Sequence, residues 1–160
     1  MATALKRLAR EYKRILKEPS QYYSISPSEE NTLRWEFIMF GQKDTIYNSG
    51  LFKGYILFPK SYPINAPTVY FYDIIHPNIH NDGKVCISIL HEGVDQYGYE
   101  SEAERWSPTL SVDSILMSII SMLSDPNFES PANINASVLW KNNKDEYIKK
   151  IKKLIAKSQQ

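Results

Sequence analysis

Apolar residues at helical spacing open the chain. Between residues 3 and 17 they recur with the period of a helix, and most basic residues of the segment fall on another side. The apolar set is Leu5, Leu8, Tyr12, Ile15 and Leu16, and the basic set is Lys6, Arg10, Lys13 and Lys17. Pro19 cannot continue a helix. The pattern therefore predicts an amphipathic helix over residues 3–17.

Strand-like patterns follow in three segments. Residues 33–40 alternate apolar with polar side chains, and residues 51–58 and 68–72 are rich in aromatic and β-branched residues. Each segment predicts a strand. Three prolines between the last two exclude a helix there. Because the segments follow one another at hairpin-like spacing, we expect an antiparallel meander of three or four strands.

The second half of the chain returns to helical spacing. Ser111 is suited to cap a helix, with Asp113 in its first turn, and the apolar residues that follow leave little polar surface. We expect this helix to be the buried centre of the fold. A short helix is predicted over residues 131–140 and an amphipathic one around 147–155. A helix before the strands and helices after them predict an α+β fold, and a chain of 160 residues suits a single domain over residues 1–160.

The formal net charge of +1 hides a segregation of charge along the chain. Residues 1–18 carry six Lys or Arg and two Glu, and residues 141–160 carry seven Lys and two acids. The 122 residues between them hold 6 basic and 14 acidic side chains. A nucleic-acid-binding protein would be expected to have a basic stripe interleaved with aromatic residues. Since the basic residues lie on the predicted end helices, we expect protein partners and no nucleic acid.

Neither a targeting segment nor a membrane span is evident in the sequence. The first residues lead into the predicted helix without an apolar signal core. The longest apolar stretch, Ile115 to Leu123, is too short to span a bilayer. One unpaired cysteine fits a reducing compartment. We therefore predict no direct membrane insertion and a cytoplasmic location, with the nucleus as the alternative.

Cys86 is the only cysteine of the chain and the obvious candidate nucleophile. Pro77 keeps the preceding backbone extended, and Asp82-Gly83 favours a turn shortly before the thiol. A thiol just beyond a turn could lie at the mouth of a groove. The alternative is a buried structural cysteine, because free cysteines are among the most buried residues. The residues alone leave both interpretations open.

Four short motifs punctuate the chain: HPN at residues 76–78, VCISIL at 85–90, WSP at 106–108 and DPN at 125–127. In this order they resemble the catalytic core of the ubiquitin-conjugating enzymes, over nearly the whole chain. The long acidic segment between Cys86 and Trp106 is similar to the G-type, Ubc-seven-like branch. The resemblance implies the UBC fold, with an N-terminal helix, a four-stranded antiparallel meander, a buried central helix and C-terminal helices.

From this resemblance we expect the chain to have the activity of that family. An acyl carrier needs a nucleophile that is also a good leaving group, and a thiol meets both requirements. Cys86 would accept ubiquitin as a thioester from the activating enzyme and, with a RING-type ligase, transfer it to a lysine of a protein substrate. No cofactor or metal is expected, because the activating enzyme uses the ATP. The resemblance also implies degradative polyubiquitin chains and ER-associated degradation, with a partner recruiting the chain to the endoplasmic reticulum surface.

We predict roles for four residues near Cys86. By the resemblance, Ser130 lines the gate for the incoming lysine, and His76 with Pro77 holds the loop before the thiol. The Asn78 amide could donate to the oxyanion at the thioester carbonyl, an interaction worth about 3 kcal/mol in comparable sites. It could equally brace the loop by bonding to backbone.

An acidic insertion runs from His91 to Arg105. Its five acids are Glu92, Asp95, Glu100, Glu102 and Glu104. As a flexible flap beside the thiol, the insertion could gate access and favour a lysine through its negative field. Because Ser130 is uncharged, Glu129 or acids of the flap are candidates to receive the lysine proton. The alternative is a passive solvated loop. His91 could orient a carboxylate or have no chemical role.

The expected docking surfaces come from the resemblance. Lys6, Arg10 and Lys13 on the first helix would bind the activating enzyme and ligases, with simple solvation of this face as the alternative. Two loops would face the ligase, through Tyr62, Pro63 and Ile64 and through Trp106, Ser107 and Pro108. Trp106 could as readily be a core anchor.

Three other functions stay open on the sequence. The chain could carry a different ubiquitin-like modifier, hydrolyse a bond with Cys86 and His76 or His91, or be a non-catalytic module of the same fold. The acidic insertion favours ubiquitin. The lack of a recognisable Cys-His signature disfavours a hydrolase, and the presence of the cysteine disfavours the non-catalytic module.

Overall fold

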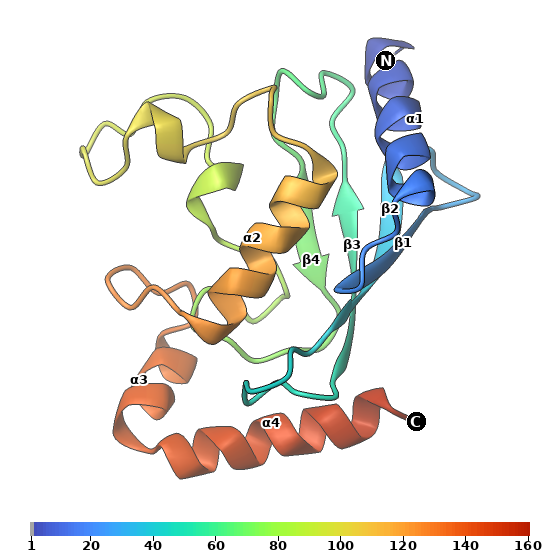
Figure 1. Ribbon diagram of the computed structural model, residues 1–160. Helices are drawn as coiled ribbons and strands as arrows, with labels where there is room; N and C mark the ends of the chain where they lie inside the picture. Colours follow the sequence, from blue (N-terminus) through green and yellow to red (C-terminus); the bar gives the residue numbers. More distant parts are fainter. Residues whose placement is uncertain (1) are drawn as a thin grey trace.

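A computed structural model describes residues 2–160 and shows a twisted sheet crossed by one central helix (Figure 1). The first helix lies at one end of the sheet and the last helix runs across the other end. In chain order the elements are α1 (Ala2–Lys17), β1 (Tyr23–Pro27), β2 (Arg34–Phe40), β3 (Leu51–Leu57), β4 (Thr68–Phe71), 3₁₀ turns at Ser88–Leu90 and Glu102–Glu104, α2 (Val112–Ser124), α3 (Ile134–Asn142) and α4 (Lys144–Ser158). The predicted α+β architecture, with an N-terminal helix, a four-stranded antiparallel meander and later helices, is confirmed.

The sheet is a four-stranded antiparallel meander in the order β1-β2-β3-β4. Trp35, Phe37 and Met39 of β2 are buried, and the residues between them are partly exposed. One face of the strand therefore packs on the core, as the alternation predicts. Gly54 pairs with Phe37 across β2 and β3, and an added Cβ there would lie 2.4 Å from the Phe37 ring, so the close packing requires glycine.

Strand β1 was not located from the sequence pattern. This strand has only five residues, includes two serines and ends at Pro27. It lies at the edge of the sheet, where a proline without an N–H breaks no ladder on its free side. Tyr23 and Ile25 alternate with Ser24 and Ser26, but a run of two apolar residues beside a proline is too short to distinguish a strand from a loop.

Helix α2 is the buried centre of the fold, as predicted. Ser111 caps it: its side chain accepts from the Ser114 N–H, while the Ser114 side chain bonds back to the Ser111 backbone. Ile115, Leu116 and Ile119 are fully buried. Each such side chain contributes roughly 1.5–3 kcal/mol through removal from water. Because α2 is anchored in the core, it holds the loops at its two ends in place.

Helix α3 begins later than predicted, at Ile134 rather than residue 131. The reason is local: the Asn133 side chain accepts from the Ala136 N–H and sets the first turn after Asn133. Helix α4 then packs against the end of the sheet through buried Tyr147 and Ile151.

Residues 2–160 contain neither a helix of the membrane-spanning type nor a cluster of metal ligands. No helix there combines the length and apolarity that crossing a membrane requires. Over the same residues, no group of three or more His, Cys, Asp or Glu side chains is placed to hold a metal ion.

Candidate active site

The edge of β4 positions the segment that carries the thiol. Val85 donates its N–H to the Val69 carbonyl at 2.9 Å, and Phe71 donates to the Gly83 carbonyl at 2.9 Å. Gly83 has a φ of +96°, and an added Cβ would lie 2.0 Å from the Phe71 oxygen. Only glycine allows this close approach. The turn therefore lays the chain against β4 and anchors Val85 in the core, one residue before Cys86.

Cys86 itself is half-buried, and its N–H donates to the Asn78 carbonyl at 2.9 Å. Burial raises the pKa of the Cys86 thiol, the Glu100 carboxylate raises it further, and Lys84 lowers it. The resting group is therefore the thiol, and a nearby base must take its proton when it attacks.

Such a base lies beside it. The Cys86 Sγ is 3.7 Å from Nε2 of His91, and the His91 Nδ1 is 2.9 Å from Glu100 Oε1. With the Nδ1–H donated to the carboxylate, Nε2 carries the lone pair and faces the thiol. Arg105 forms an ion pair with the same Glu100 carboxylate. The acidic insertion thus folds back on Cys86 and forms a thiol–imidazole–carboxylate line. From the sequence, a role for His91 in orienting a carboxylate was one of two alternatives.

Buried hydrogen bonds hold the HPN segment. His76 is fully buried, its Nδ1 accepts from the Asn78 N–H at 2.9 Å, and its Nε2–H donates to the Met122 carbonyl at 2.9 Å. Just before it, the hydroxyls of Tyr47 and Tyr147 lie 2.7 Å apart, each 2.9 Å from the Ile75 carbonyl oxygen. His76 is therefore an uncharged side chain that links the HPN segment to the end of α2 through hydrogen bonds.

The burial of His76 predicts acid sensitivity of the fold. Desolvation lowers the pKa of His76 to about 4, although bonds to the Met122 and Leu123 backbone oppose this. Above pH 6.5 the ring is neutral in both states, and as the pH falls toward 4 only the unfolded chain gains the proton. The free energy of unfolding should fall by about 3 kcal/mol across that window.

Urea unfolding of the wild type and of His76→Gln at a series of pH values measures this effect. The variant should be less stable at pH 7, and its stability should fall less steeply between pH 6.5 and 4. Parallel curves for the two proteins would show that His76 does not titrate in this way.

Asn78 is buried, and both ends of its side-chain amide bond to one residue. Its Nδ2 donates to the Asn127 carbonyl, and its Oδ1 accepts from the Asn127 N–H, each at 2.8 Å. These two bonds are the ones that the predicted brace requires. The second N–H of Nδ2 is the one that the predicted oxyanion donor would use. The observed bonds support the brace, and the oxyanion role stays a prediction.

Ser130 lies exposed in the loop between α2 and α3. The loop is attached to the HPN segment at both ends, through the Asn78–Asn127 pair and through the Asn133 N–H, which donates to the Pro77 carbonyl at 2.9 Å. Its Ser130 hydroxyl is therefore carried by the same backbone frame that holds Cys86. The gate role of Ser130 stays a prediction.

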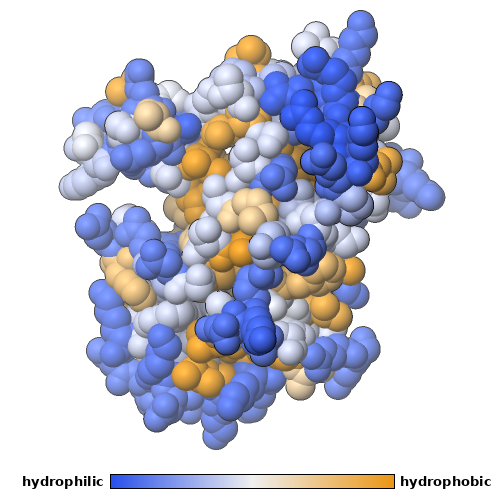
Figure 2. Space-filling view, in the orientation of Figure 1, coloured by the Kyte–Doolittle hydropathy of each residue, from blue (hydrophilic) through white to orange (hydrophobic). Residues whose placement is uncertain are grey.

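The acids of the insertion separate into two kinds. The Asp95 carboxylate accepts from the backbone N–H groups of Tyr97 and Glu100 at 2.9 Å each, and these bonds lower the pKa of Asp95. Glu102 and Glu104 are exposed. Figure 2 shows the insertion as a hydrophilic lobe with a notch beneath it. Asp95 and Glu100 thus shape the loop, and Glu102 and Glu104 present charge to solvent.

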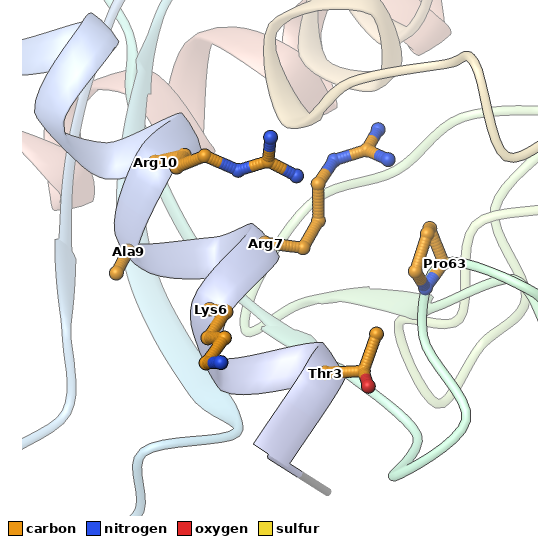
Figure 3. Close-up of a pocket in the computed structure, with 6 residues that line it drawn as sticks. All are labelled: Thr3, Lys6, Arg7, Ala9, Arg10 and Pro63. Carbon is orange, nitrogen blue, oxygen red and sulfur yellow. The ribbon is translucent and has the colours of Figure 1, made fainter.

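The predicted docking residues fall into an exposed group and a buried group. Lys6, Arg10 and Ile64 are exposed, and a surface hollow of about 580 Å³ lies between α1 and Pro63 (Figure 3). Tyr62 is 1% and Trp106 9% exposed. Those two aromatic side chains cannot form the outer surface. Instead the Trp106 indole N–H donates to the Pro63 carbonyl at 2.9 Å and joins the two predicted ligase loops.

The sequence analysis missed a buried carboxylate beneath this surface. Glu11 is 6% exposed, accepts from the Val112 N–H at 2.7 Å and from Arg7 Nε at 3.0 Å, and bonds to the Tyr62 hydroxyl. It joins α1, the Tyr62 loop and the start of α2. An acid on an amphipathic helix gives no local signal of such burial. Asn127 was named only within the DPN motif, and the pairing of its backbone with Asn78 was not predicted.

Comparisons with known proteins agree over nearly the whole chain. A family model described as "Ubiquitin-conjugating enzyme" matches residues 7–155. The chain is 46% identical over 159 residues to Ubiquitin-conjugating enzyme E2 G2 of Homo sapiens, covering 98% of this chain and 96% of that protein. It is 45% identical over 156 residues to Ubiquitin-conjugating enzyme E2 7 of Arabidopsis thaliana, covering 96% and 94%. Against Ubiquitin-conjugating enzyme E2 15 of Schizosaccharomyces pombe, the identity is 44% over 154 residues, covering 94% and 92%.

Proposed function

Since this chain belongs to the ubiquitin-conjugating enzyme family and is a ubiquitin-conjugating enzyme, we propose that Cys86 is the residue that carries ubiquitin. The predicted family is confirmed, and the similarity to E2 G2 and E2 7 agrees with the predicted branch. Membership implies ubiquitin, an activating enzyme and ligases as partners in general. The observation that supports Cys86 most is its 3.7 Å contact with His91, itself bonded to Glu100.

Loading is an exchange of thioesters. The Cys86 sulfur attacks the carbonyl carbon of the thioester on the activating enzyme, and that enzyme's thiolate leaves. The proton of the attacking thiol passes to His91 Nε2, and Glu100 stabilises the imidazolium that forms. Because one thioester replaces another, the step is close to thermoneutral and needs no metal or cofactor from this chain.

Discharge is the step that needs a base. Only about one free lysine in 2,500 is neutral at pH 7. His91 is neutral again once its proton from the loading step has passed to the leaving thiolate of the activating enzyme. It then accepts a proton from the incoming ammonium, and the amine attacks the thioester carbonyl. The carbon–sulfur bond breaks and an amide forms, the second proton of the attacking nitrogen passes to solvent, and the imidazolium returns its proton to the Cys86 thiolate. Ser130 orients the amine from the loop opposite, and Asn78 acts as a brace for that loop.

The docking surface follows from exposure and charge. We assign contact with the activating enzyme and a RING-type ligase to Lys6, Arg10 and Lys13 of α1 and to the exposed part of the loops at Pro63-Ile64 and Ser107-Pro108. Tyr62, Trp106 and Glu11 support this surface from beneath. Lysine recognition is favoured by the negative field of Glu102 and Glu104.

Several finer expectations belong to the same proposal. A single catalytic domain over residues 1–160 rests on the chain length and the resemblance. Degradative polyubiquitin chains on protein substrates and recruitment by a partner to the endoplasmic reticulum surface rest on the resemblance alone. A cytoplasmic location rests on the single unpaired cysteine.

A charging reaction tests the proposed carrier. Purified protein incubated with ubiquitin, ubiquitin-activating enzyme and ATP should form one adduct that a thiol reductant removes. Addition of free lysine should then discharge it. Charging only with a different ubiquitin-like modifier and its activating enzyme would assign the chain another cargo, and hydrolysis of a substrate without ATP would favour the hydrolase.

The acidic insertion should act through two separable effects. Glu100→Gln removes the charge that stabilises the His91 imidazolium, and we expect discharge to lysine to slow by about tenfold or more. The pair Glu102→Gln and Glu104→Gln removes only exposed charge, so its effect should be smaller and should vanish in salt, because exposed charges are screened beyond about 8 Å at physiological ionic strength. Single-turnover discharge at low and high salt measures both. Equal rates for all three proteins would show a passive insertion.

A further inference from the structure

The Glu92 carboxylate joins the acidic insertion to the predicted ligase loop. Its Oε2 accepts from Asn65 Nδ2 at 2.9 Å, and its Oε1 accepts from the Ala66 backbone N–H at 2.8 Å. Both carboxylate oxygens are therefore engaged on one segment, 26 and 27 residues away in the chain. Because both of its carboxylate oxygens accept hydrogen bonds, Glu92 differs from the solvent-facing acids of the insertion.

The backbone around Glu92 is held from the other side. Arg105 Nη2 donates to the Glu92 carbonyl at 2.9 Å, and the Trp106 N–H donates to the His91 carbonyl at 2.8 Å. The indole N–H of the same Trp106 reaches the Pro63 carbonyl at 2.9 Å. The His91-Glu92 dipeptide is thus clamped between the loop at residues 62–67 and residues 105–106.

The residue next to Glu92 faces the thiol. His91 Nε2 lies 3.7 Å from Cys86 Sγ, with Nδ1 on Glu100. Because Glu92 is one peptide bond away, a displacement of the loop at Asn65 and Ala66 is transmitted to the His91 backbone. The contacts at Glu92 are exposed, so they can break and re-form without disturbing the core.

We propose that Glu92 is a positioning residue that couples the ligase-facing loop at residues 62–67 to the placement of His91 beside Cys86. This inference rests on the proposed function, in which His91 receives the proton of the attacking lysine. A ligase bound on the loop would then stiffen or shift the Asn65–Glu92 contact and thereby tune discharge. Glu92 itself touches no reacting atom.

Single-turnover discharge of the Cys86 thioester to free lysine, without any ligase, tests the coupling. Glu92→Ala breaks both bonds and should slow discharge by about fivefold, which is about 1 kcal/mol and the size of a typical net hydrogen-bond contribution. Asn65→Ala leaves the bond to the Ala66 N–H in place and should slow discharge by about twofold. The double variant should be no slower than Glu92→Ala, because both changes break one connection. In a His91→Ala background, Glu92→Ala should have no further effect.

Matched variants separate positioning from structure. Glu92→Gln keeps an oxygen that accepts from the Ala66 N–H, so it should restore discharge to within about twofold of the wild type. Glu29→Ala removes one exposed acid from the connection between β1 and β2, outside both the loop and the insertion, and should match the wild type. Melting temperatures of the Glu92 and Asn65 variants should lie within about 2 °C of the wild type, since the broken contacts are exposed.

The outcomes distinguish this inference from the function beneath it. Failure of the wild type to load ubiquitin overturns both. Normal discharge by His91→Ala overturns the role of His91 and the coupling with it. Slow discharge by His91→Ala with normal discharge by Glu92→Ala overturns the coupling alone, as does a double variant whose slowing equals the product of the two single effects.

Discussion

Replacing Cys86 with serine should change the ubiquitin adduct from one that a thiol reductant removes to one that it does not. The hydroxyl can occupy the place of the sulfur beside His91 and accept the same acyl group, but it leaves as a much poorer leaving group. The oxyester should therefore accumulate and discharge to lysine far more slowly. Cys86→Ala should form no adduct at all.

The measurement is gel electrophoresis of charging reactions, with and without reductant, followed by lysine discharge. Because Cys86 is the only cysteine, a reductant-sensitive adduct cannot form elsewhere on the wild-type chain. Circular dichroism of both variants controls for folding. A reductant-sensitive adduct on correctly folded Cys86→Ala would overturn the carrier assignment.

Replacing Asn78 with alanine should cost about 2 kcal/mol of folding free energy, because two hydrogen bonds to the Asn127 backbone are lost at a buried side chain. For a domain of this size the melting temperature should fall by about 4 to 8 °C. Since Asn78 braces the frame that holds both Cys86 and the Ser130 loop, loading and discharge should slow to a similar extent.

Asn78→Asp is the matched control. The aspartate can still accept from the Asn127 N–H but cannot donate to the Asn127 carbonyl, so it should lie between wild type and alanine in stability. Urea unfolding and the two single-turnover rates are measured for each protein. Unchanged stability with discharge slowed by about a hundredfold, and loading unaffected, would instead identify an oxyanion donor.

Periodicity was sufficient for most of the fold. The predicted strand at residues 33–40 is β2, Arg34–Phe40, and the predicted first helix at 3–17 is α1, Ala2–Lys17. These elements are determined locally, because burial of one face imposes a period of two on a strand and 3.6 on a helix. In β1 the alternation covers only Tyr23 to Ser26 and ends at a proline, so the strand could not be predicted locally although it exists.

The motifs around Cys86 pointed from the sequence to the family, which the comparisons show. The HPN motif contains Asn78 and the acidic insertion begins at His91, and the fold brings both residues into contact with Cys86. The hydrogen-bond partners of those residues could not be predicted from the sequence. Asn78 bonds to Asn127 across 49 positions, and nothing in either residue's neighbours specifies the other.

The tertiary structure alone decided which polar side chains work together. Glu92 meets Asn65 and Ala66, Glu11 meets Tyr62, and Trp106 turns inward to Pro63 rather than outward to a partner. A sequence determines which faces must be buried, since that depends on the composition of each segment. Hydrogen bonds between loops depend on where packed helices and strands leave those loops, and that geometry exists only once the whole chain has folded.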